Sequence, residues 1–179
     1  MVMTSMAESK VQAMDDEAKT ELKSILATYR ARLLDSQDRE AKIKTARVTF
    51  VEAFRNLKVE RIAPVLEEFV AELNEAGHQA SIVDHQEASD RNVQFTPASI
   101  ALRILPARIG DAAAPQSGAP RIEVTFSANQ HTMKVLVSSS NNSNGSVGKR
   151  GDYELAELTK EFVESNVLKT IRQAFAIGK

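Results

Sequence analysis

The hydrophobic period of this chain changes at Gly77, and this change constrains the fold more than any other feature of the sequence. Before Gly77, apolar residues recur at steps of three and four, as on one face of an amphipathic helix. After it, apolar and polar residues alternate, as in strands with one buried face. The pattern predicts a helical region over residues 11–77. An antiparallel sheet and a final helix should follow over residues 78–179, and we expect one continuous domain.

Two helices are expected within the helical region. The first apolar series ends at Leu33 and has the steps of a coiled-coil seam, and a second series begins at Ile43. Residues 36–38 (Ser-Gln-Asp) offer a break and a new N-cap between the two series, so we predict a helical hairpin. Pro64 either starts a third helix or kinks the second, because it has no N–H to donate. Residues 1–10 are predicted to be a loose tail.

Four strands are expected after Gly77, at residues 80–85, 99–105, 122–127 and 133–138. The last two are joined by so few residues that only a tight antiparallel hairpin fits. One face of this hairpin is apolar, and we predict that its side chains are buried: Ile122, Val124, Phe126, Val135 and Val137.

The segments around this hairpin complete the predicted fold. Residues 110–120 and 138–151 are rich in Ala, Pro, Gly, Ser and Asn, and we expect both to be mobile loops. Asp152 is expected to cap the last helix. The fold class is therefore α+β. It has an N-terminal helical hairpin and a four-stranded antiparallel meander sheet, which the C-terminal helix covers on one face.

The composition excludes several classes of function. The chain has no Cys, which excludes thiol nucleophiles. Its net charge of −1 gives no support to a dedicated nucleic-acid binder. The first residues carry no leader-like basic and apolar regions, and no apolar run is long enough to span a bilayer. We expect a cytoplasmic protein that does not enter the membrane. No catalytic motif, metal-ligand pattern or cofactor-binding motif is recognisable.

Two groups of residues are candidate binding sites. Arg103, Glu123, Thr125 and Lys134 occupy polar positions of the predicted sheet and could form a platform for a ligand or partner. The alternative is a solvated sheet face with ordinary cross-strand ion pairs. Lys149 and Arg150 lie in a Gly-rich segment just before the predicted last helix, where free N–H groups favour anions. The alternative there is a solvated loop.

These features favour a non-catalytic interaction module. We expect it to self-associate as a homodimer through its coiled-coil-like N-terminal helices, and to bind a protein partner by its sheet or loops. A small-molecule binder or enzyme with a pocket between the sheet and the helices is the alternative. Nucleic-acid binding through Lys149 and Arg150 is a weaker third reading.

Overall fold

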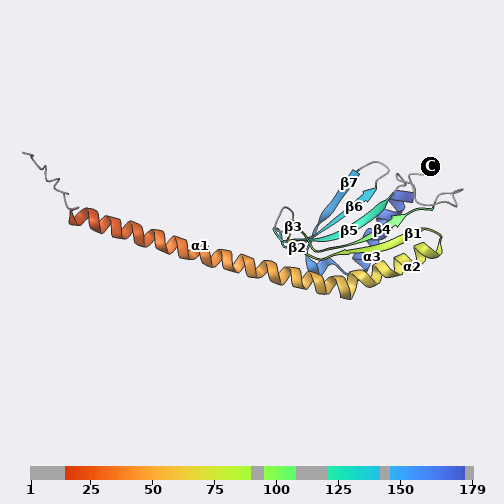
Figure 1. The fold of residues 1–179 in the computed structure, drawn as a ribbon, viewed down its shortest axis with the longest axis horizontal. Coiled ribbons are helices and arrows are strands. Elements are labelled where there is room, and N and C mark those ends of the chain that lie inside the picture. Colours follow the sequence, from red (N-terminus) through yellow and green to blue (C-terminus); the bar gives the residue numbers. More distant parts are fainter. Residues whose placement is uncertain (1–14, 90–94, 108–120, 142–145, 176–179) are drawn as a thin grey trace, which may run out of the picture. The chain divides into compact units, whose positions relative to one another are not determined.

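The structure is a computed structural model that describes residues 15–89, 95–107, 121–141 and 146–175, and it is of the α+β class (Figure 1). The tail predicted for residues 1–10 and the loop predicted for residues 110–120 lie outside the described residues. The chain divides into two units, residues 1–45 and residues 46–179, which are described in turn. None of the described helices is long and apolar enough to cross a lipid bilayer.

Unit 1 contains the first part of helix α1, which runs from Asp16 to Leu57. Asp15 caps it, because the Ala18 N–H donates to its carboxylate at 2.9 Å. The helix continues without a break through residues 36–38, so the predicted helical hairpin is not confirmed. Polar residues are tolerated at exposed helical positions, and an ion pair one turn apart (Asp35 to Arg39, 2.7 Å) supports the helix there.

In unit 2 the helix passes through a π-helical turn, Lys58–Ile62, before helix α2, Ala63–Glu75. The Ala63 N–H donates to the Lys58 carbonyl, five residues earlier. Pro64 explains the wider turn, since it cannot donate to residue 60 and its ring would crowd that carbonyl in a regular helix. Pro64 was predicted either to start a helix or to kink one, and each prediction is partly correct. It lies in the first turn of α2, and the helix changes direction there (Figure 1).

Gly77 ends the helical region, as predicted. It has a φ of 86°, which a residue without Cβ adopts at little cost. The His78 N–H donates to the Leu73 carbonyl at 2.9 Å, and the Gly77 N–H donates to the Asn74 carbonyl at 3.0 Å. This pair of bonds is a Schellman motif, which closes the helix and turns the chain toward the sheet.

The sheet has five antiparallel strands in the order β1-β4-β5-β6-β7. Their bounds are Gln79–His85, Ser99–Leu105, Ile122–Asn129, Lys134–Asn141 and Ser146–Tyr153. Two short strands, β2 (Ala88–Ser89) and β3 (Phe95–Thr96), pair separately.

The prediction of four strands is wrong, and so is the prediction of a loop at residues 138–141 and 146–151; residues 142–145 lie outside the described residues. Residues 138–141 belong to β6, and β7 pairs with β6 along its length, with an irregularity at Val137/Ser138. The Ser, Asn and Gly of this segment have low intrinsic strand preference, so its pairing follows from the neighbouring strand.

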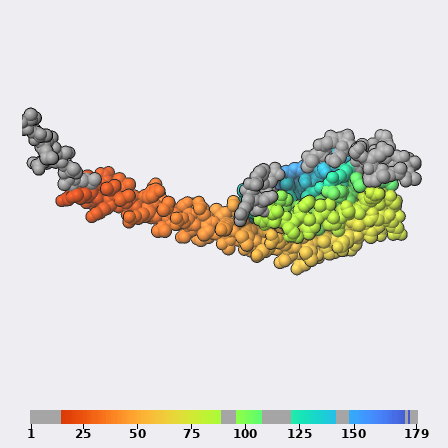
Figure 2. Space-filling view, viewed as in Figure 1, coloured from red at the N-terminus to blue at the C-terminus, as the bar shows by residue number. Residues whose placement is uncertain are grey.

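One face of the sheet packs against helices. The inward side chains of β4, β5 and β6 join those of α2 and of α3 (Lys160–Phe175) in one apolar core. All five side chains predicted for the hairpin core are at most 2% exposed, which confirms that prediction. Coverage by a C-terminal helix is also observed, and α2 lies beside β1, as Figure 2 shows in yellow and yellow-green.

Asp152 is not a helix cap, because it lies within β7. The 3₁₀ turn Leu155–Glu157 begins with a capping box between Glu154 and Glu157. Helix α3 begins after Thr159, whose hydroxyl accepts the Phe162 N–H at 3.2 Å.

Candidate functional site

Most of the exposed large apolar side chains among the described residues lie on the unit 1 part of α1. Five large side chains on one helical face are 43–61% exposed, and we call them the apolar stripe: Leu22, Ile25, Leu26, Tyr29 and Leu33. Their spacing places them within an arc of about 100° around the helix axis. Leu34 is also 61% exposed but points away from this arc. A stripe of this kind is typical of a helix that packs against another helix.

The outer face of the sheet, opposite the helices, brings together three of the four predicted residues. Arg103 lies directly across from Glu123, and its Nε donates to Glu123 Oε2 at 3.1 Å. The Thr125 hydroxyl donates to the other carboxylate oxygen at 3.4 Å. Arg121, which was not predicted, donates to Glu123 Oε2 at 2.7 Å. Each group of this cluster therefore already has a partner.

The charges of this cluster favour the ionised carboxylate. Partial burial by itself would raise the pKa of the Glu123 carboxyl. Hydrogen bonds from Arg121 and Arg103, with their positive charge, outweigh burial and hold the pKa below its usual range. The cluster is an ion-paired patch on a sheet face, as the alternative reading of the sequence describes.

Lys134 lies apart from these three residues. It stands at the start of β6 opposite Asn129, at the hairpin end of the sheet. Its Nζ contacts the Glu154 carboxylate at 3.0 Å, and this hydrogen bond raises the pKa of the ammonium group. The structure therefore does not bring all four residues into one site.

Lys149 and Arg150 lie in β7 and not at a helix N-terminus. Lys149 pairs with Asp152 at 2.6 Å. Arg150 reaches the opposite way, donating from Nε to the Ser139 hydroxyl at 3.1 Å and from Nη2 to the Gln173 side chain in α3 at 2.7 Å. Burial lowers the pKa of Arg150. The two cations point to different partners and do not converge.

A polar cluster around Lys58 was not predicted from the sequence. This residue lies in the π-helical turn and is 2% exposed. Its Nζ pairs with the Asp84 carboxylate and donates to the carbonyls of His85 and Ser99, each at 3.4 Å. One signal was present, because Lys58 continues the four-residue steps of Phe50 and Phe54 on the buried helix face. The cluster ties the helix to the adjoining ends of β1 and β4.

Both edges of the sheet carry features that discourage pairing with another strand. The Asn74 side chain accepts the Ala80 N–H at 2.8 Å and donates to the Ala80 carbonyl at 3.3 Å. It thus occupies backbone groups of β1 that a neighbouring strand would use. On the other edge, β7 is charged at Lys149 and Arg150 and irregular in register. Such edges protect a sheet from edge-to-edge association.

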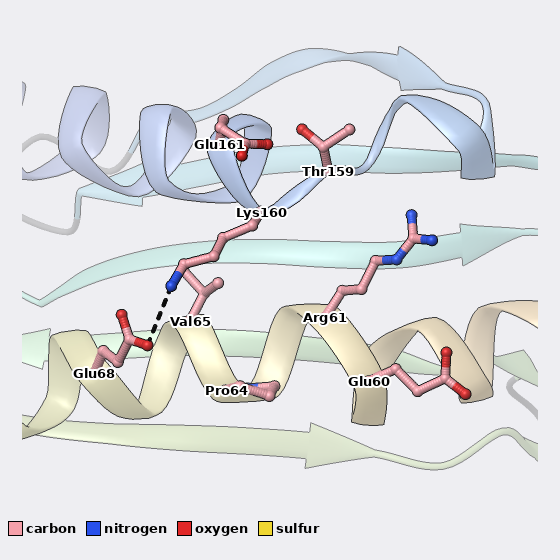
Figure 3. Close-up of a pocket in the computed structure, with 8 residues that line it drawn as sticks. All are labelled: Glu60, Arg61, Pro64, Val65, Glu68, Thr159, Lys160 and Glu161. Carbon is pink, nitrogen blue, oxygen red and sulfur yellow. Dashed lines mark hydrogen bonds and ion pairs between the residues drawn. The ribbon is translucent and has the colours of Figure 1, made fainter.

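A shallow pocket of about 400 Å³ lies between the π-helical turn, α2 and the start of α3 (Figure 3). Figure 3 shows Lys160 reaching across to Glu68, at 3.3 Å, and Arg61 extending toward the start of α3. The Glu161 carboxylate accepts its own backbone N–H and the Thr159 hydroxyl, and both lower its pKa. The Glu161 N–H in the first turn of α3 therefore already has an anionic acceptor, and the residues that line the pocket are of mixed charge.

The space between the sheet and the helices is filled by the apolar core. Within the described residues, no group of three or more His, Asp or Glu side chains could hold a metal ion. Comparison with known proteins found no matching family model, no similar curated protein and no similar solved structure.

Proposed function

We propose that this protein is a non-catalytic interaction module that self-associates as a homodimer through residues 16–45 of α1. The exposed apolar stripe is the observation that carries the proposal. Full burial of one Leu or Ile stabilises by roughly 1.5–3 kcal/mol, so five such side chains can drive association. The stripe would be costly to leave in water.

The length of the exposed helix supports the same proposal. Ala18 is partly buried, and every other residue from 16 to 45 is exposed. Helices in proteins are held mainly by packing of an apolar face, and isolated helices in water are marginal. A partner along the stripe would supply that packing.

The charges of this segment allow a second copy as the partner. Residues 16–45 contain six acidic and seven basic side chains, so two copies meet without a large net repulsion. The protected edges of the sheet make association through β1 or β7 less favourable. A two-fold dimer would place the same stripe on both sides of the interface.

Light scattering at micromolar concentration tests the proposal. The wild-type chain should have twice the monomer mass of 19.6 kDa. The double variant Leu26→Glu with Leu33→Glu should be monomeric, because it buries charge in the interface. Its far-UV circular dichroism should show less helix, since the separated helix is marginal.

Leu34→Glu is the matched control. It changes the same residue type on the same helix, but at an exposed position outside the stripe. This variant should remain dimeric. A wild-type mass of 19.6 kDa would overturn self-association.

A further inference from the structure

Four of the five residues of the apolar stripe, all except Ile25, belong to a longer row of positions with alternating steps of four and three. Four members are apolar and follow one another directly: Leu22, Leu26, Tyr29 and Leu33. The same steps continue outward to Lys19 on one side, and to Ser36, Glu40 and Ile43 on the other. We call these eight positions the seam. In a pair of helices, seam residues face each other in layers.

A parallel pair in register would stack identical seam residues. Lys19 would face Lys19 of the second copy, and Glu40 would face Glu40. Arg39 and Lys44, on the flanks of the seam, would also approach each other. Like charges in these layers oppose association, and those within the seam would be partly desolvated.

We infer that the two copies pair antiparallel, with Tyr29 of each helix packed against Leu33 of the other. This inference rests on the proposed self-association. Outward from that central layer, Leu26 faces Ser36, Leu22 faces Glu40, and Lys19 faces Ile43. None of these seam layers combines like charges.

The flanks of the seam carry contacts of both signs in this arrangement, so the seam layers decide the orientation. Asp16 of one copy approaches Lys44 of the other, in addition to its own contact with Lys19 at 3.0 Å. Arg30 and Arg32 lie beside the two-fold axis, where each approaches the same residue of the other copy. Both are at exposed positions, where a long side chain can extend into solvent.

Disulfide mapping tests the orientation, and the chain suits it because it contains no Cys. Two variants, Leu26→Cys and Ser36→Cys, are oxidised separately and as an equimolar mixture. In the antiparallel pair, each new Cys lies about 15 Å along the axis from the same Cys in the other copy. The mixed disulfide should therefore form at least about tenfold more than either homodisulfide. A dominant Ser36→Cys homodisulfide would overturn the inference in favour of a parallel pair.

A second pair of Cys variants leaves every seam residue unchanged. It therefore tests the orientation even if Leu26→Cys weakens the dimer. Asp16→Cys and Lys44→Cys are mixed and treated with a short bismaleimide. In a parallel pair these positions lie about 40 Å apart and cannot be linked. Ser24→Cys, on the outer side of the helix, is the control and should not cross-link.

Light scattering on the untreated wild type separates the two failures. A dimer without the mixed cross-links would overturn the antiparallel arrangement alone. A monomer would overturn the proposed self-association and the arrangement with it.

Discussion

Lys58 and Asp84 form an ion pair whose two members differ greatly in burial: their side chains are 3% and 47% exposed. Replacing Asp84 by Ala leaves a buried ammonium without a countercharge, which should cost roughly 2–4 kcal/mol. Replacing Lys58 by Met removes the buried charge and keeps most of the volume, at a cost of less than about 2 kcal/mol. Urea unfolding of the two variants should thus show the larger loss at the more exposed residue. A larger loss for Lys58→Met would contradict this account.

The lowered pKa of Glu123 predicts that stability depends slightly on pH. Its pKa is lower in the folded protein than the ordinary 4.5, so the fold favours the ionised form. This contribution is fully present above pH 4.5 and is lost as the pH falls through the lower folded-state pKa. Glu123→Gln should lower the free energy of unfolding at pH 7 by about 1 kcal/mol or less. Denaturation at pH 7 and pH 3 should show this difference shrinking, and a difference independent of pH would refute the prediction.

Strand β7 has no room for a side chain at Gly151. A Cβ there would lie 2.9 Å from the Tyr153 ring, which packs edge-on against Phe162 in α3 at a centroid distance of 4.7 Å. Gly151→Ala must displace this ring and should destabilise the protein by about 1–3 kcal/mol.

Gly148→Ala is the control in the same strand, because its added methyl would meet the nearest atom at 3.8 Å. It should be neutral or stabilise slightly, since Ala loses less conformational freedom than Gly. Thermal melts of the two variants measure the contrast. Equal shifts would mean that the Tyr153 ring moves aside freely.

The division of the chain into two units predicts the effect of a large truncation. The large apolar residues of the core all lie at or after Phe50, within residues 46–179. Removal of residues 1–45 should leave a folded monomer whose free energy of unfolding lies within about 1 kcal/mol of that of the same unit in the full chain. Light scattering gives its mass, and urea titration gives its stability. A truncated chain that still dimerises would place the interface on unit 2.

The sequence by itself determined the parts of this protein whose pattern is local. The change of hydrophobic period located the helical region and the sheet, and Gly77 marked the boundary because its backbone requirement arises from its own residue type. The short turn after β5 set the register of its hairpin, and with it the buried face that contains Phe126. Glu123 and Thr125 share a sheet face because they are two residues apart in one strand, but the position of Arg103 beside them depends on the β4–β5 register across a long connection. Lys134 was misplaced, although the same hairpin register puts it opposite Asn129 and away from Glu123.

The tertiary structure alone decided the features that depend on distant residues. Strand β7 has little strand preference of its own, and pairing with β6 supplies its structure. Lys58 is buried because β1 and β4, which follow 26 and 41 residues later, provide acceptors for its N–H groups. The continuity of α1 through residues 36–38 could not be predicted from the sequence either, because polar residues occur both in exposed helices and at helix breaks. In each case local preference is weak, and contacts far along the chain, or exposure to solvent, determine the conformation.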